Sequence, residues 1–111
     1  MSAADHPLHA VAYVSIQLLP PRRAHALVVR AGSILPQRRT AEAVRLAASR
    51  LRSGTCLSRA LTISARAPGS EVVIGVGRPS AFNAHAWVEI DGVPVRPTDP
   101  SGAELARLRR P

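Results

Sequence analysis

The sequence predicts an α+β domain in which several helices precede a small antiparallel sheet. The first part of the chain carries helical signals: capping residues, glycine stops and apolar residues at helical spacing. From residue 72 onward the apolar residues form short runs, and Asp91-Gly92 is a strong signal for a two-residue hairpin turn. Helices that come first and strands that come later are typical of the α+β class.

The composition supports one globular domain with a small aliphatic core. The chain has 111 residues, 46% of them apolar, so it is neither long enough for two domains nor polar enough for a disordered tail. Only 3% are aromatic, so Ala, Val, Leu and Ile must build the core. All 15 basic residues are arginine and the net charge is +8, but the arginines are dispersed. This pattern favours attraction to an acidic peptide or partner over a nucleic-acid surface.

Several classes of protein are excluded by what the sequence lacks. One cysteine cannot form a disulfide framework or a cysteine-rich zinc site, and no run of about 20 apolar residues is present to cross a membrane. The first residues lack the basic start and apolar run of a signal peptide. We therefore expect a cytoplasmic protein without a metal or another cofactor.

Residues 1–35 contain no chemical motif. Residues 8–19 are largely apolar and fit a helix or a strand equally well, whereas residues 22–31 indicate a short helix that ends at Gly32. The apolar surfaces of this segment exceed what a small core absorbs, so we expect part of it to dock a partner. Three histidines stand outside any motif and are expected at the surface or against a neighbouring helix: His6, His9 and His25.

Two further helices are predicted from their N-terminal caps. Thr40 is the expected cap of a helix over residues 41–52. Gly54 ends that helix, and Thr55 then caps a second one that begins at Cys56.

The predicted sheet follows. The continuous apolar run over residues 72–76 is typical of a buried strand, and residues 84–90 form a second strand. After the turn, Val93 and Val95 alternate on the return strand. The spacing from Ser101 to Glu104 is that of a capping box and predicts a short C-terminal helix.

Three residues could form a catalytic site. Cys56 is predicted in the first turn of a helix, where unpaired backbone N–H groups stabilise an anion such as a thiolate nucleophile. His85 could transfer a proton, and Asp99 could orient the imidazole. Asp91 competes for this third role, although Asp91-Gly92 fits a turn, and Ser101 as the cap of the last helix leaves Asp99 available.

Each of these residues also has a purely structural interpretation. Cys56 could be a small buried apolar residue, His85 a hydrogen-bonded core histidine, and Asp99 a helix cap. Trp87 shares a side of its strand with His85 and Glu89, so it could wall a substrate site or belong to the core.

Three segments together resemble a known family. They are the run CLSRAL from Cys56, the run VIGV from Val73 and the run AHAWVEIDG from Ala84. Their order and spacing, over roughly residues 40–100, resemble the transglutaminase-like cysteine peptidases of lasso peptide biosynthesis, the C-terminal half of the B protein. Thr98-Asp99-Pro100 resembles the Asp-Pro pair that follows the histidine strand in such folds.

The resemblance implies a single peptidase domain over residues 1–111, with a transglutaminase-like or papain-like core over 40–100. It implies that Cys56 is the nucleophile, His85 the general base and acid, and Asp99 the orienting carboxylate. Such an enzyme removes the leader from a ribosomally made lasso precursor peptide. It acts with a separate leader-recognition protein and an ATP-dependent cyclase. The alternative is a catalytically weak module of the same fold that binds a partner protein or peptide.

Overall fold

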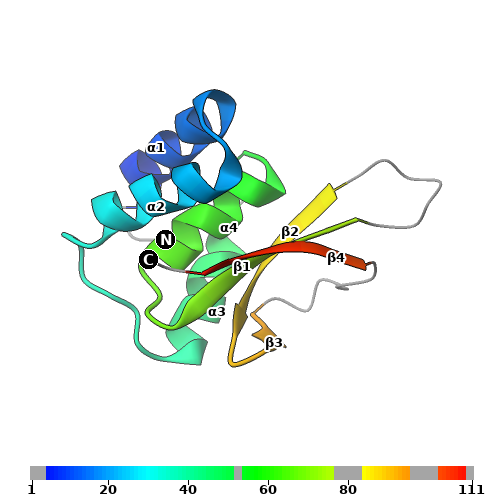
Figure 1. Cartoon of the computed structure of the whole chain (residues 1–111). Helices are drawn as coiled ribbons and strands as arrows, with labels where there is room; N and C mark the ends of the chain where they lie inside the picture. The colour runs from blue at the N-terminus through cyan, green and yellow to red at the C-terminus, as the bar shows by residue number, and fades with distance from the viewer. Residues whose placement is uncertain (1–4, 52–53, 77–83, 96–102, 110–111) are drawn as a thin grey trace.

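Four helices pack on one face of a four-stranded antiparallel sheet, which confirms the α+β prediction (Figure 1). The computed structural model describes residues 5–51, 54–76, 84–95 and 103–109. The helices are α1 (Asp5–Leu18), α2 (Pro21–Gly32), α3 (Ala41–Arg50) and α4 (Cys56–Ala65). The strands are β1 (Ser70–Val76), β2 (Ala84–Ile90), β3 (Val93–Pro94) and β4 (Ala103–Arg109), and their order in the sheet is β3-β2-β1-β4.

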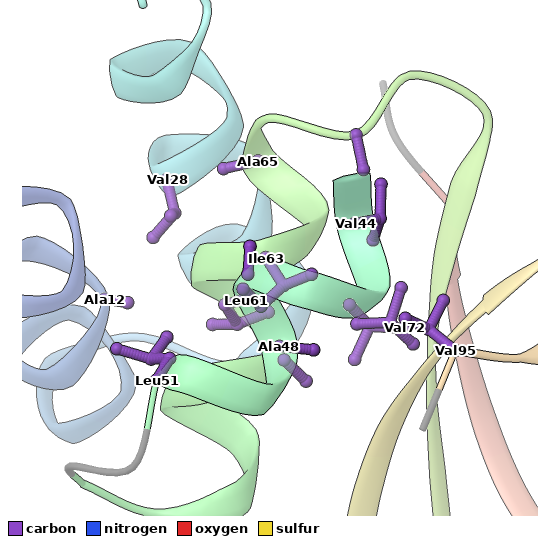
Figure 2. Packing of buried hydrophobic residues seen from close by; sticks show 14 of the residues in the cluster. Ala12, Val28, Val44, Ala48, Leu51, Leu61, Ile63, Ala65, Val72 and Val95 are labelled. Atoms are coloured by element: carbon purple, nitrogen blue, oxygen red, sulfur yellow. The ribbon is translucent and has the colours of Figure 1, made fainter. Parts of the chain in front are cut away.

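Helix α4 lies at the centre of the molecule. It contacts all three other helices as well as β1 and β2, and every residue from Ala60 to Ala67 is buried. Leu61 and Ile63 on α4 meet side chains that come from both layers (Figure 2). The core cluster contains only Ala, Val, Leu and Ile among the described residues, as the composition predicts. Because the largest of these side chains are small, the layers must approach closely to exclude water.

The apolar segment that fitted either a helix or a strand forms α1. Leu8, Ala12 and Ser15 are buried at helical spacing against the rest of the helical layer. Helix α2 begins at Pro21, where the missing N–H of proline would have no helical partner in any case. At its other end Gly32 is required, because a Cβ there would lie 2.8 Å from the Ala65 carbonyl oxygen.

A buried ion-pair network joins the start of α1 to the end of α4. Asp5 Oδ1 accepts from Arg66 Nη1 at 2.9 Å, and Asp5 Oδ2 accepts from Arg38 Nη2 at 2.6 Å. The Asp5 side chain is 1% exposed and that of Arg66 is 6% exposed. Arg66 Nε also donates to the Pro36 carbonyl at 2.9 Å, so the loop before α3 is held by the same network.

The two faces of the sheet differ in what they contact. Val72, Val88 and Leu108 belong to the core cluster and face the helices. The alternate positions, among them Trp87 and Glu89, face away from the helices. The predicted turn at Asp91-Gly92 is confirmed, because both residues have the positive φ that a tight hairpin requires, 52° and 78°.

The predicted C-terminal helix is wrong: residues 103–109 form strand β4. This strand pairs with β1, with Val72 opposite Leu108 and Val73 opposite Arg107. Its side chains alternate in environment, with Leu108 in the core and Arg107 in ion pairs with Glu89 and Glu71. Pairing with β1 therefore prevails over the local capping pattern that predicted a helix after Ser101, a residue that itself lies outside the described ranges.

We predict that Asp5→Ala destabilises the protein by about 3 kcal/mol or more, because it leaves the buried guanidinium group of Arg66 without its carboxylate. Urea denaturation followed by circular dichroism measures the loss. Glu42→Ala is the control, since Glu42 is an exposed acid in the first turn of α3 and its loss costs less than about 1 kcal/mol. Equal losses for both variants would contradict the structural role of Asp5.

Candidate functional site

Cys56 is the first residue of α4 and is half-buried. The helix starts there because Thr55 and Ser58 form a reciprocal capping box, as predicted for the Thr55 cap. Thr55 Oγ1 accepts from the Ser58 N–H at 3.1 Å, and Ser58 Oγ accepts from the Thr55 N–H at 3.0 Å. The box holds the cysteine at the end of the helix where backbone N–H groups favour negative charge.

His9 on α1 reaches the start of α4, which the sequence did not indicate. Its Nε2 lies 3.0 Å from Ser58 Oγ. Gly54 has a φ of 79°, and a Cβ there would lie 2.5 Å from His9 Nε2, so only glycine allows the imidazole to pack against this turn. Burial lowers the pKa of His9 below its ordinary value of 6.5, and the charges of Arg59 and His6 lower it further. His9 is therefore part of the helix start rather than a simple surface residue.

The topology brings the start of β2, which carries His85, to the same end of the domain as Cys56, but strand alternation puts position 85 in the row of Trp87 and Glu89, which faces away from α4. The structure therefore brings the two candidates to one end of the domain, but no contact that it describes joins them. Helix α4 has ten residues and is about 15 Å long, and the chain then reverses at Gly69. Strand β1 runs back beside it for about 17 Å from Ser70 to Gly75. Gly75 is paired with His85. Figure 1 shows the start of α4 and the start of β2 on the same side of the molecule.

Of the two candidate acids, Asp91 and Asp99, only Asp91 lies among the described residues. Asp99 lies outside the described residues. Asp91 occupies the hairpin turn, six positions along the strand from His85, which corresponds to about 20 Å. A carboxylate at that distance cannot bond to an imidazole at the start of β2. The sequence predicts that Ser101 caps the last helix and so leaves Asp99 available for catalysis. Residues 103–109 form a strand, so this reason no longer holds, and the role of Asp99 needs other support.

Trp87 belongs to a polar network on the sheet face that is turned away from α4. Its Nε1 donates to Glu89 Oε2 at 2.8 Å, and Glu89 Oε1 accepts from Arg107 Nη1 at 2.9 Å. Glu89 is only 8% exposed although it is acidic. Sequence reasoning assigned no role to Glu89, because its partner Arg107 lies on a strand that was predicted as a helix. The role of Trp87 at a substrate site stays a prediction.

His25 on α2 is buried against the neighbouring helix α4, one of the two positions expected for it. It is 1% exposed, and its Nε2 lies 3.0 Å from Ser64 Oγ near the end of α4. Ser64 Oγ in turn lies 3.0 Å from Ser70 Oγ. The two histidines thus contact serines at opposite ends of the same helix.

The described part of the chain shows neither a metal-binding group nor a membrane-crossing helix. Within residues 5–51, 54–76, 84–95 and 103–109, no three His, Cys, Asp or Glu side chains gather where they could hold a metal ion. No helix in these ranges is both long and apolar enough to span a bilayer.

A comparison with known protein families places the chain in one of them. The model of the transglutaminase-like superfamily matches residues 8–110. The chain therefore belongs to the transglutaminase-like superfamily, which includes cysteine peptidases and transglutaminases. No curated protein and no solved structure matches the sequence significantly. The match includes α2 and all but the first few residues of α1, so the helical N-terminal segment is part of the family pattern.

We predict that Gly54→Ala destabilises the protein more than Gly69→Ala does. Both glycines have a φ near 80°, where an alanine costs about 1 kcal/mol, but only a Cβ at residue 54 collides with the His9 ring. The free energy of unfolding in urea, measured for both variants, isolates the collision from the backbone strain. Equal losses would show that the His9 ring moves away without cost.

Proposed function

We propose that the protein is a cysteine peptidase that removes the leader from a ribosomally synthesised lasso precursor peptide. The observation that carries the proposal is the position of Cys56 at the capped start of α4, at the end of the domain where β2, with His85 as its second residue, begins. The superfamily provides the reaction class. The runs around Cys56 and His85, which resemble those of the lasso leader peptidases, provide the substrate class.

The mechanism follows from the roles of the two residues. The Cys56 thiolate attacks the carbonyl carbon of the scissile amide and forms a tetrahedral intermediate. The Cys56 backbone N–H is our candidate donor to its oxyanion, because N–H groups at a helix start point toward a bound anion. His85 protonates the departing amine of the core peptide. It then removes a proton from water, which releases the leader as a free acid from the thioester.

Asp99 is the proposed orienting carboxylate. Val95 N donates to the Val88 carbonyl at 2.9 Å, so Val95, the last described residue before residue 103, lies beside β2 three positions from His85. The four residues from Val95 to Asp99 span at most about 14 Å. Val88 is about 10 Å along the strand from His85, so this length is sufficient. Asp91, by contrast, is held at the distant turn.

The N-terminal helices are the proposed docking surface for a separate leader-recognition protein, and the cyclase is a further proposed partner, in the cytoplasm. Val11, Val14 and Leu18 follow each other at helical spacing on α1 and are 37%, 54% and 76% exposed. Leu27 on α2 is 45% exposed, whereas Val28 and Val29 are buried in the core. The exposed α1 residues form one continuous stripe, which is the form in which helices present apolar surface to a partner.

We predict that the wild-type protein, mixed with the recognition protein and a precursor peptide, releases the leader, whereas Cys56→Ala and His85→Ala do not. Mass spectrometry follows the products. Asp99→Asn should lose at least about a hundred-fold in rate and Asp91→Asn almost none, because only a nearby carboxylate holds the imidazole tautomer. Cleavage by Cys56→Ala would refute the mechanism. Partner binding by a wild-type protein that does not cleave would instead favour the catalytically weak module.

We also predict that Leu18→Ser weakens binding of the recognition protein about ten-fold, because it removes an apolar contact from the α1 stripe. Leu46→Ser is the matched control, since Leu46 is 52% exposed on α3, away from that stripe. Isothermal titration calorimetry measures both affinities. Equal effects of the two variants would place the interface elsewhere.

A further inference from the structure

The proposed mechanism leaves one histidine at the start of α4 without a function. His9 lies on α1, yet its imidazole contacts Ser58, two residues after the candidate nucleophile. The contact links residues 49 positions apart in the sequence and joins two helices that pack together. It is thus a tertiary restraint on the turn of α4 that carries Cys56.

The Ser58 hydroxyl can accept one more hydrogen bond than the capping box uses, and the His9 imidazole supplies it. Its oxygen accepts from the Thr55 N–H at 3.0 Å, and its proton is directed to the Thr55 carbonyl, also at 3.0 Å. A hydroxyl oxygen has two lone pairs, so one remains for the N–H of His9 Nε2 at 3.0 Å. With the Ser58 proton on the Thr55 carbonyl, His9 Nε2–H is the donor in this contact. His9 completes the capping box from outside the helix.

We propose that His9 is a positioning residue for Cys56, because its contact with Ser58 fixes the first turn of α4. The proposal rests on the peptidase function proposed above. A small displacement of this turn moves the sulfur relative to the scissile carbonyl, and such a displacement lowers the chemical rate more than it lowers substrate binding.

The surroundings of the imidazole oppose a positive charge. Among the described residues, Arg59 of α4 and His6 of α1 are the charged or titratable groups that act on His9, and the ring of Tyr13 lies 6.3 Å away. Burial, Arg59 and His6, in that order, lower the pKa of His9 below 6.5. The unfolded chain therefore binds this proton more readily than the folded one. The contribution of neutral His9 to folding stability is therefore complete above pH 6.5, and it is lost as the pH falls through the lower pKa that His9 has in the folded protein.

Two substitutions test the hydrogen bond. His9→Gln places an amide N–H donor near the position of Nε2, whereas His9→Leu has no donor. At pH 8 we expect kcat for leader cleavage to fall about ten-fold or more in His9→Leu with KM unchanged, and His9→Gln to stay within about three-fold of wild type.

His25→Leu is the matched control, because His25 makes a bond of the same length, 3.0 Å, to Ser64 at the other end of α4. It should destabilise the protein without lowering kcat per folded molecule. If that variant does not fold, Ser64→Ala removes the same bond. A loss of kcat in His9→Leu no greater than in the control, or an equal loss in His9→Gln and His9→Leu, would overturn the proposal.

Amide hydrogen exchange provides a readout that needs no substrate. In His9→Leu the N–H groups of Thr55 and Ser58, which the capping box protects, should exchange at least about five-fold faster than in wild type. Unchanged exchange would overturn the role of His9 in holding the turn, even if the protein cleaves its substrate. Faster exchange in a protein that cleaves no precursor would instead show that the peptidase function is wrong while His9 still holds the helix.

Discussion

The structure depends on one constraint: α4 packs against three helices and two strands, so each of its buried polar groups needs a partner. Thr62 Oγ1 donates to the Ser58 carbonyl at 2.7 Å, within the helix itself. Ser58 and Ser64 are instead completed by imidazoles from α1 and α2. A buried hydroxyl without a partner would cost about 1–3 kcal/mol, so these bonds fix where the two N-terminal helices lie. The N-terminal segment is thus part of the support of the site as well as a candidate docking surface.

The features that could be predicted from the sequence are those decided by neighbouring residues. Thr55 caps a helix that begins at Cys56, and Asp91-Gly92 turns a hairpin, because each signal acts within a few positions. Features that depend on distant partners could not be predicted. Asp5 meets Arg66 across 61 positions, and His9 meets Ser58 across 49. The residues of β4 carry a local helix signal in the sequence, yet they form a strand because they pair with β1. Of the candidate site, the position of Cys56 was predictable, whereas the support that His9 gives it was not.

The structure also changes the interpretation of the positive charge. Arg38 and Arg66 neutralise Asp5 in the interior, and Arg107 neutralises Glu89 on the sheet. These arginines stabilise the fold through ion pairs, so they are not free to bind an acidic partner. Others are exposed on the helical layer, and these remain able to attract one: Arg22, Arg23, Arg30, Arg39, Arg45 and Arg50. The total of 15 arginines therefore overstates the surface that could recognise a peptide.

The strand order β3-β2-β1-β4 has a consequence for how the chain is made. A ribosome produces β1, β2 and β3 in sequence, and β2 can pair with β1 as soon as their hairpin emerges. The opposite edge of β1 has no partner until β4, which ends at Arg109, has also been synthesised. During that interval a central, apolar strand presents open backbone groups, which is the state in which sheets join to other chains. The last described strand thus completes the sheet during biogenesis and closes its most aggregation-prone edge.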